Sequence, residues 1–347
     1  MATLQVVPQV VPQLLGMDFQ LLFENFFSFT ISGLAVGSVY ALVALGYTMV
    51  YGVLQLINFA HSEVFMYGTF AVIWTVYFLG GDAQSGLGEM IWMLLVALVV
   101  AMAVSASVAL LLERLAYRPL IKRDAPKLVA LISAIGASFM LAEAMGLRSK
   151  IAAFVGLDDN LEYYVTRSRD NKGMPFDFPQ EPVVTIGDYT VTTTDLLVVF
   201  SALAMMVFLD QYVRRSKMGR GIRAVAQDPE SAALMGVNST RVVQVTFLLG
   251  GLMAGAAATL YMVRIGATKF DAGFILGVKA FTAAVMGGIG NLRGALLGGL
   301  ILGVAENWGS AIFGTEWKDI VAFVLLVFIL LFRPSGLLGE ALGKARA

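Results

Sequence analysis

Apolar segments of membrane-spanning length recur along the whole chain, and they constrain its fold more than any other feature. A transmembrane helix needs about 20 predominantly apolar residues to cross the roughly 30 Å hydrocarbon core of a bilayer. Segments near this length lie at 26–50, 54–79, 90–113, 128–147, 195–213, 240–264, 274–290, 294–313 and 317–332. The sequence therefore predicts an all-α fold, a polytopic transmembrane helical bundle of eight or nine spans in contact with membrane lipid. We expect residues 1–347 to form a single domain.

Composition agrees with a membrane protein and excludes several classes of function. Hydrophobic residues make up 58% of the chain and charged residues 14%, whereas soluble domains carry about 25% charged residues. The formal net charge is zero, so nothing indicates a nucleic-acid partner. The absence of cysteine excludes disulfides, thiol catalysis and thiolate metal sites. The first 113 residues contain no Lys or Arg, so we expect no cleavable signal peptide.

Two details of the spans carry local predictions. The first two spans are almost continuous in sequence, and Tyr51-Gly52 is the expected bend between them. The seventh and ninth spans are short, so we expect them to be broken or tilted.

Basic residues predict the orientation of the chain. Five Lys and Arg lie in 114–127 and six lie in 214–241, and others occur at Arg293 and from Arg333 onward. With nine alternating spans, all these groups fall on one side, which the positive-inside rule makes cytoplasmic. The N-terminus is then expected outside and the C-terminus in the cytoplasm.

The segment 148–194 is then expected on the external side. Within it, residues 183–192 alternate in a way that favours a small hairpin around Gly187-Asp188. The segment is either a cap on the external face, a contact for an external partner, or a floppy insertion.

The segment 214–241 is predicted to carry a short helix at the cytoplasmic surface. Asp228 is a typical N-cap, Pro229 suits the first turn, and Glu230 complements the positive end of the helix. Gly236 can end the helix in a left-handed conformation. The resulting helix, 229–235, is about 10 Å long and has no apolar stripe of its own. It is expected to contact another protein; the alternative is an ordinary polar loop.

Glycine is frequent, and two arrangements of small residues stand out. Gly33, Gly37 and Ala41 form one small-residue face. A second row consists of Gly290, Gly294 and Gly298 at four-residue spacing and is continued by Gly299 and Gly303. In a bilayer, such faces let helix backbones approach closely.

The run from Gly287 to Gly294 has a different interpretation. It contains Gly287, Gly288, Gly290 and Gly294 but follows no strand, and the pattern Gly-x-x-x-x-Gly-Lys-Ser/Thr is absent from the chain. We therefore expect no ATP hydrolysis by this chain alone. The run predicts a tight break between two half-length helices.

Ionisable groups within apolar segments are candidates for function. The strongest cluster is Asn58, His61 and Glu63, which holds the chain's only histidine. One His with one carboxylate is too little for a metal site, so no metal and no cofactor is predicted. A general acid–base pair and a polar cap at the cytoplasmic start of span two both remain open. Glu143 and Glu306 are candidates for lining a cavity.

One further charged residue, Lys279, lies within the seventh apolar segment. It is interpreted as close to a helix end, where its side chain would snorkel toward the interface.

Several of these motifs together resemble one family. They are 33–52, 57–63, the segment Glu113-Arg-Leu-Ala-Tyr-Arg-Pro119, 130–136 and 279–290. They are similar to the first inner-membrane permease of the high-affinity branched-chain amino acid ABC importers. The segment 216–236 resembles that family's ATPase-coupling loop, with Glu230-Ser-Ala-Ala233 in the place of its EAA-like element. Ser62 departs from the family pattern, which usually has Gly there.

The resemblance implies a transport subunit of the bacterial inner membrane rather than an enzyme, with no catalytic residues of its own. Its implied partners are a second, related permease in a heterodimer, two cytoplasmic ATPases and a periplasmic binding protein. The implied substrates are leucine, isoleucine and valine. Related permeases carry urea, short amides or other amino acids.

The resemblance also assigns roles to residues. The implied ATPase-coupling residues are Arg220, Arg223, Asp228, Glu230, Ala232, Ala233, Leu234 and Gly236. Among them, Ala232, Ala233 and Leu234 are expected to fill a groove in the ATPase. The cluster of Asn58, His61 and Glu63 is expected near the cytoplasmic end of the path.

Two other functions are weighed against this one. A stand-alone channel or ion-driven carrier would need intramembrane carboxylates as ion sites, for which only Glu143 and Glu306 are available. An intramembrane enzyme would have to rely on His61 without a paired nucleophile.

Overall fold

The computed structural model describes residues 18–123, 125–156, 162–165, 167–187 and 189–339. Within these residues, nine apolar helices match the nine predicted segments. They are α3 (Phe26–Leu54), α4 (His61–Phe78), α5 (Leu87–Leu112), α7 (Lys127–Gly146), α10 (Thr193–Arg215), α13 (Ser239–Ile265), α14 (Ala272–Gly287), α15 (Leu292–Phe313) and α16 (Lys318–Phe332). Six helical stretches are long and apolar enough to cross a membrane, and α14 is a shorter apolar helix. The polytopic helical bundle is thereby confirmed.

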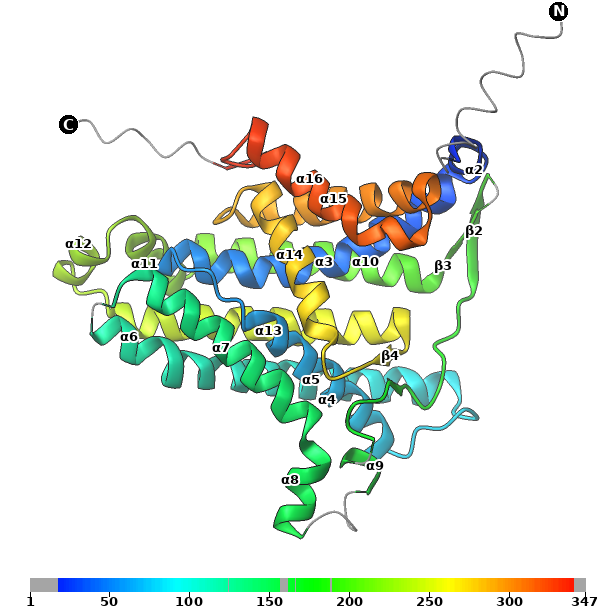
Figure 1. Cartoon of the computed structure of the whole chain (residues 1–347), viewed down its shortest axis with the longest axis horizontal. Helices are drawn as coiled ribbons and strands as arrows, with labels where there is room; N and C mark the ends of the chain where they lie inside the picture. The colour runs from blue at the N-terminus through cyan, green and yellow to red at the C-terminus, as the bar shows by residue number, and fades with distance from the viewer. Residues whose placement is uncertain (1–17, 124, 157–161, 166, 188, 340–347) are drawn as a thin grey trace, which may run out of the picture.

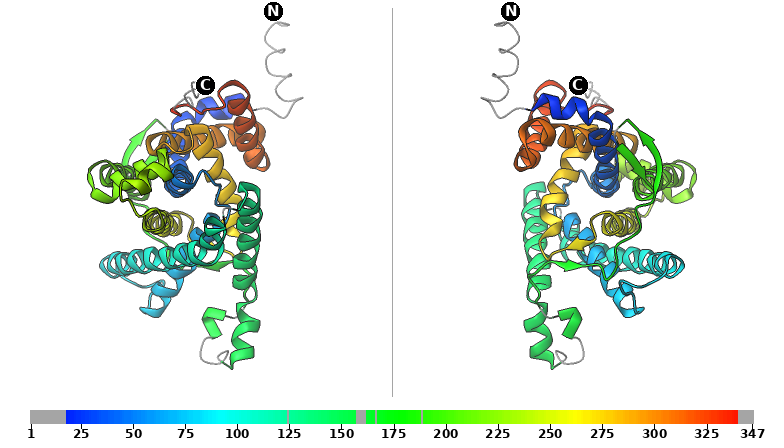
Figure 2. Two further views of the ribbon diagram at one scale, coloured as in Figure 1. Left: turned by 90° about the vertical axis from the view of Figure 1, so that its left-hand side faces the viewer. Right: turned by 90° about the vertical axis from the view of Figure 1, so that its right-hand side faces the viewer.

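The long helices run side by side along the long axis of the molecule, whereas α4 and α14 cross the bundle obliquely (Figure 1). One end of the bundle carries α11 (Lys217–Gln227) and α12 (Pro229–Leu234); we call it the α12 end. The opposite end carries β2 (Pro182–Ile186) and β3 (Tyr189–Thr192); we call it the hairpin end. Figure 2 shows α7 upright at the edge of the bundle, with α8 (Arg148–Val155) continuing it.

The remaining elements are short. They are α2 (Phe19–Glu24), the π-helical turn η1 (Glu113–Tyr117), α6 (Arg118–Lys122), α9 (Glu162–Val165), β1 (Lys172–Gly173), β4 (Ala267–Thr268) and the 3₁₀ turn η2 (Thr315–Trp317). Strands β2 and β3 pair antiparallel, with Thr185 opposite Thr190, which confirms the predicted hairpin; Asp188 lies outside the described residues. Strand β1 pairs with β4, so the 148–194 segment is tied to the bundle, against its interpretation as a floppy insertion.

Close backbone contact holds α3 against α15, and this is the most extensive helix pair in the bundle. A Cβ atom at Gly303 would lie 2.3 Å from the carbonyl oxygen of Gly33, and one at Gly299 would lie 2.5 Å from Cα of Ala41. The two small-residue faces noted in the sequence therefore pack against each other. Without side chains between them, the two backbones gain dispersion contacts, which are a main driving force for helix association in lipid.

The connection between α3 and α4 differs from the prediction. Tyr51 and Gly52 lie within α3, which continues to Leu54, and the chain leaves the helix at its C-cap Gln55, which adopts a left-handed conformation with φ of 51°. Helix α4 begins only at His61. Because Tyr51 and Gly52 are compatible with a helix interior, the break falls where the apolar run itself is interrupted by Gln55.

The predicted break among the glycines is present. Helix α14 ends at Gly287. The next two glycines, Gly288 and Gly290, have positive φ angles of 107° and 97°. Asn291 then caps α15 by accepting a hydrogen bond from the backbone of Arg293. The prediction of two half-length helices was wrong for α15, which has 22 residues, whereas α14 has 16. The close approach of Gly294 to the carbonyl of Gly287 explains the absence of side chains at this turn.

Candidate functional site

A cavity of about 410 Å³ lies between α3, α13, α14 and the start of α16. Its volume is within the range of small-molecule sites. It extends from β4 at the hairpin end to Tyr40, the central residue of α3, and to Lys279 near the middle of α14. The cavity therefore reaches about halfway through the bundle.

The innermost wall of this cavity is charged. The Nζ atom of Lys279 lies 2.5 Å from Oε1 of Glu306 and 2.6 Å from Oδ1 of Asp319. Lys318 contributes a second ammonium, 4.0 Å from Oε1 of Glu306. These four charges sum to zero and come from α14, α15 and α16. The interpretation of Lys279 as a snorkelling residue was wrong, because its side chain is only 8% exposed and pairs with carboxylates inside the bundle.

The two carboxylates that the sequence singled out for a cavity have different positions. Glu306 is fully buried behind Lys279, and its Oε2 atom has no partner among the described residues. Glu143 lies on α7, is about half exposed, and forms an ion pair with Arg169. Glu143 therefore contributes to the surface, and the structure does not bring it together with Glu306.

A polar cluster surrounds the start of α4, closer to the α12 end. Glu63 accepts a hydrogen bond from Ser138 at 3.2 Å, His61 lies edge-on to Tyr47 with ring centroids 4.9 Å apart, and Asn58 accepts from Tyr117 at 3.0 Å. The structure thus brings together the three residues of the sequence cluster, all nearly fully buried. Each retains one polar atom without a partner among the described residues: Nδ2 of Asn58, Nε2 of His61 and Oε2 of Glu63.

The depth of this cluster differs from the predictions. The ring of His61 contacts the backbone of Gly46, which lies eight residues, or about 12 Å, from the end of α3. His61 and Glu63 lie in the first turn of α4, as expected for polar residues at the start of span two. The 55–60 connection turns back into the bundle, however, so this turn lies inside the bundle and not at its end.

Helix α14 covers this cluster closely. A Cβ atom at Gly277 would lie 2.2 Å from Cβ of Ser62, and one at Gly273 would lie 2.9 Å from Oε2 of Glu63. The backbone of α14 therefore seals Ser62 and Glu63, which we call the polar rung of α4. Ile275 and Lys279, on another face of α14, line the cavity.

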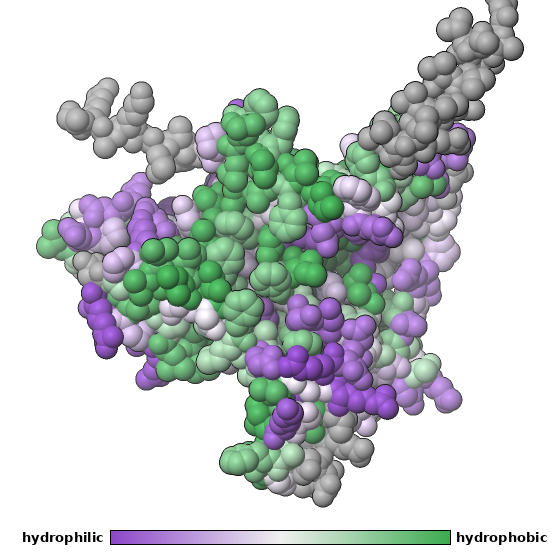
Figure 3. Space-filling model, in the orientation of Figure 1, coloured by the Kyte–Doolittle hydropathy of each residue, from purple (hydrophilic) through white to green (hydrophobic). Residues whose placement is uncertain are grey.

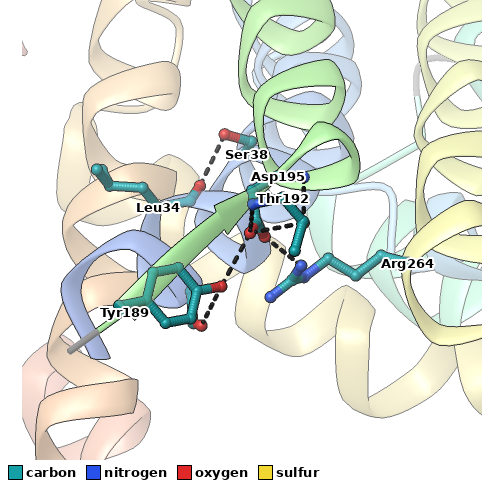
Figure 4. A network of polar contacts seen from close by, with 7 residues as sticks. Leu34, Ser38, Tyr189, Thr192, Asp195 and Arg264 are labelled. Atoms are coloured by element: carbon teal, nitrogen blue, oxygen red, sulfur yellow. Dashed lines mark hydrogen bonds and ion pairs between the residues drawn. The ribbon is translucent and has the colours of Figure 1, made fainter. Parts of the chain in front are cut away.

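A network at the hairpin end fixes the hairpin to the bundle (Figure 4). Asp195 is 1% exposed, forms an ion pair with Arg264 of α13, and accepts hydrogen bonds from the hydroxyl groups of Tyr189 and Thr192, both at 2.8 Å. The sequence analysis missed this site. The sequence did contain one sign of this site, the capping box formed by Thr192 and Asp195 at the start of α10. The ion-pair partner of Asp195, Arg264, is 69 residues away, so no local sequence pattern reveals it.

The α12 segment has the predicted local structure. Asp228 accepts hydrogen bonds from the backbone of Glu230 and Ser231, Pro229 opens the helix, and Gly236 has φ of 83°. The hydrogen bond from the Ser231 side chain, together with the backbone bonds, lowers the pKa of Asp228. A carboxylate thus caps the helix at neutral pH.

The side chains predicted to contact an ATPase are not all available on this surface. Ala232 is buried in its own chain, so it cannot enter a groove in another protein while this packing is kept. Leu234 and Met235 are 89% and 85% exposed. Arg223 donates to the carbonyl of Val213. Arg220, Glu230, Ala233 and Gly236 are exposed.

Helix α11, which precedes α12, was not predicted. Its signal was the spacing of Ile222 and Val225, which are both buried, after the N-cap Ser216. The abundance of basic residues concealed this apolar face.

Comparisons with known proteins add to this geometry. The sequence model of a family described as the permease component of branched-chain amino acid transport systems matches residues 29–330. The high-affinity branched-chain amino acid permease BraD of Pseudomonas aeruginosa is 39% identical over 313 residues, covering 89% of this chain and 94% of the relative. LivH of Escherichia coli (strain K12), another such permease, is 39% identical over 315 residues with the same coverage. The fructose import permease FrcC of Rhizobium meliloti is 35% identical over 134 residues, covering 36% of this chain and 37% of the relative.

Proposed function

The chain belongs to the family of permease components of branched-chain amino acid transport systems, and from this premise we propose that it forms the membrane path by which an ABC importer takes up leucine, isoleucine or valine. The observation that carries the proposal is the similarity to BraD and LivH along 89% of the chain. Substrates of other chemistry, such as urea, short amides or other amino acids, are the alternative, because a permease for fructose shares part of the sequence.

The partners follow from what such a path requires. Two cytoplasmic ATPases contact the α12 end, where a capped helix projects Leu234 and Met235 into solvent. A periplasmic binding protein delivers the substrate at the hairpin end, where the cavity begins. A second, related permease completes the path in a heterodimer. In this arrangement the α12 end is cytoplasmic, in agreement with the basic residues of α11.

The geometry suggests how the path works. The cavity reaches the middle of the bundle from the hairpin end, and α14 separates it from the polar rung formed by Ser62 and Glu63. Closure of the ATPases would displace α11 and α12, and through them α13, against which both pack. A shift between α14 and α4 would then open the polar rung toward the cytoplasm and close the cavity.

Uptake by the purified importer tests this function. The chain is isolated in mild detergent with the subunits that accompany it, and the complex is reconstituted into liposomes that contain ATP. With the binding protein outside, we expect uptake of radiolabelled leucine that requires ATP and is suppressed by unlabelled isoleucine and valine. Suppression by urea or short amides alone would point to the alternative substrates. Uptake that persists without any ATPase would contradict the proposal and favour a carrier.

A further inference from the structure

We propose that the cavity is a receiving site for the free amino acid, with the substrate carboxylate on Lys279 and its ammonium on Asp319. The inference rests on the proposed function and adds to it a binding site within the permease itself. It is carried by the cavity, by the ammonium of Lys279 in its lining, and by the carboxylate of Asp319, which pairs with that ammonium without itself lining the cavity.

The cavity walls match both parts of such a ligand. The side closer to α3 and α14 is apolar and includes Val36, Val39, Ile275 and Leu276. The inner wall carries the ammonium of Lys279. The branched aliphatic side chain of a free amino acid would cover the apolar wall and remove it from water. The carboxylate and ammonium groups of the same amino acid would meet charges of opposite sign.

The two carboxylates that pair with Lys279, those of Glu306 and Asp319, differ in how easily they can be displaced. Glu306 is fully buried, and breaking its ion pair would leave an isolated charge inside the protein. The side chain of Asp319 is 52% exposed at the first turn of α16, so it can rotate into water at little cost. The pair of Lys279 and Asp319 is therefore the one that a ligand can enter.

A zwitterion is the ligand that fits this pair. When it enters between Lys279 and Asp319, each of its charges meets one of the separated partners, and the net charge of the cluster remains zero. An ion of one sign would meet only one of the two groups and would change the net charge of the cluster.

The surrounding surface indicates water rather than lipid. Figure 3 shows hydrophilic residues breaking the apolar surface on the half of this face that lies toward the hairpin end. The side chains of four charged residues in or next to the cavity are at least one-third exposed: Asp319, Lys318, Lys269 and Asp271. Charged side chains at such positions face a water-filled path or another subunit rather than hydrocarbon.

Site-specific labelling tests the inference, because the chain contains no cysteine of its own. Leu276→Cys places one thiol on the cavity wall, and Ile275→Cys supplies a second position. The nucleotide-free importer in lipid nanodiscs is treated with a charged methanethiosulfonate reagent, with and without leucine. We expect saturating leucine to slow modification of both cysteines, whereas leucinamide, which lacks the carboxylate, and 4-methylpentanoate, which lacks the ammonium, leave the rate unchanged. Phe154→Cys, at a site 93% exposed on α8 and given no role in binding, is the matched control and should react equally fast in all conditions.

Substitution of the ion pair completes the test. Asp319→Asn keeps the pair of Lys279 with Glu306, and should raise the leucine concentration needed for half-protection by about tenfold, as expected for loss of one charge-assisted contact. The proposal is overturned if leucine leaves both cysteines unprotected, or if protection is unchanged in Asp319→Asn. ATP-driven leucine uptake, measured in the same preparations, separates the two hypotheses: uptake without protection refutes only this site, whereas absence of uptake in the unmodified importer refutes the proposed function.

Discussion

At the scale of single residues, Asp195 is the side chain with the most concentrated set of polar contacts. Its carboxylate links β3, α10 and α13 through Tyr189, Thr192 and Arg264. Asp195→Ala would leave the guanidinium of Arg264 without its partner in a largely buried site, so we expect a loss of about 3–5 kcal/mol in the free energy of unfolding. Thermal unfolding of the purified chain in detergent, followed by tryptophan fluorescence, measures this loss.

The matched control is Glu143→Ala, which removes a carboxylate from the half-exposed pair with Arg169. Exposed pairs contribute less than about 1 kcal/mol, so this variant should unfold close to the unsubstituted chain. Equal destabilisation by the two substitutions would show that the burial of Asp195 does not increase its contribution to the free energy of unfolding.

Residue patterns revealed local interactions well and distant ones poorly. The capping role of Asp228 and the left-handed Gly236 follow from neighbours in the chain, and both were predicted correctly. The pairing of Lys279 with Glu306 and Asp319 joins three helices, so a single sequence offered no signal for it. The same holds for the burial of Ala232, which depends on what α12 packs against.

At the scale of elements, the packing of α3 on α15 depends on the absence of side chains. Gly303→Val would place a Cβ atom 2.3 Å from the backbone oxygen of Gly33, and neither backbone can yield without separating the helices. We expect destabilisation of more than about 3 kcal/mol, the upper end for overpacking. Gly136→Val on α7 is the control, because its Cβ would meet no atom within 4 Å. Thermal unfolding of both variants checks the prediction, and unaltered stability of Gly303→Val would refute the close packing.

The exposed end of α12 provides a second prediction for an element. Leu234→Glu places a charge on the surface proposed to contact an ATPase, so we expect leucine uptake to fall by at least about tenfold, as for loss of an interface hot spot. The chain itself should remain folded, because Leu234 is 89% exposed. Phe154→Glu, at a site 93% exposed on α8, is the control and should retain uptake.

Two results would contradict this placement of the ATPase contact. Normal uptake in Leu234→Glu at normal expression would be the first. Equal loss of uptake in both variants would be the second, since it would indicate a general effect of a charge on an exposed apolar site.

Element prediction succeeded where a single physical requirement dominates. Membrane thickness fixes the length of an apolar helix, and all nine predicted segments overlap helices of the structure. Helix α11 was missed because its apolar face is narrow and its sequence basic, and the end of α3 was misplaced because a glycine was taken for a bend. The course of residues 55–60 back into the bundle depends on the space left by α13 and α14, which no local pattern encodes.

At the scale of the whole molecule, the direction of every helix can be tested with inserted cysteines. If all nine apolar helices cross the membrane, Gln84→Cys and Thr185→Cys lie on the hairpin side, and Arg123→Cys and Ala233→Cys lie on the α12 side. We expect a membrane-impermeant maleimide to label the first two in intact cells whose outer membrane is permeable to the reagent. The other two should react only after the inner membrane is opened.

The position of greatest diagnostic value is Gln84→Cys, because α4 starts inside the bundle at His61 and has only 18 residues, about 27 Å of helix. Labelling of Gln84→Cys from outside, with Arg123→Cys protected, requires that α4 and the preceding 55–60 connection together complete one crossing. Protection of Gln84→Cys in intact cells, with Arg123→Cys labelled, would mean that the hairpin side faces the cytoplasm, and it would reverse the proposed direction of the whole bundle. The cavity would then open toward the cytoplasm, the receiving site would be a release site, and α12 could not be the ATPase contact.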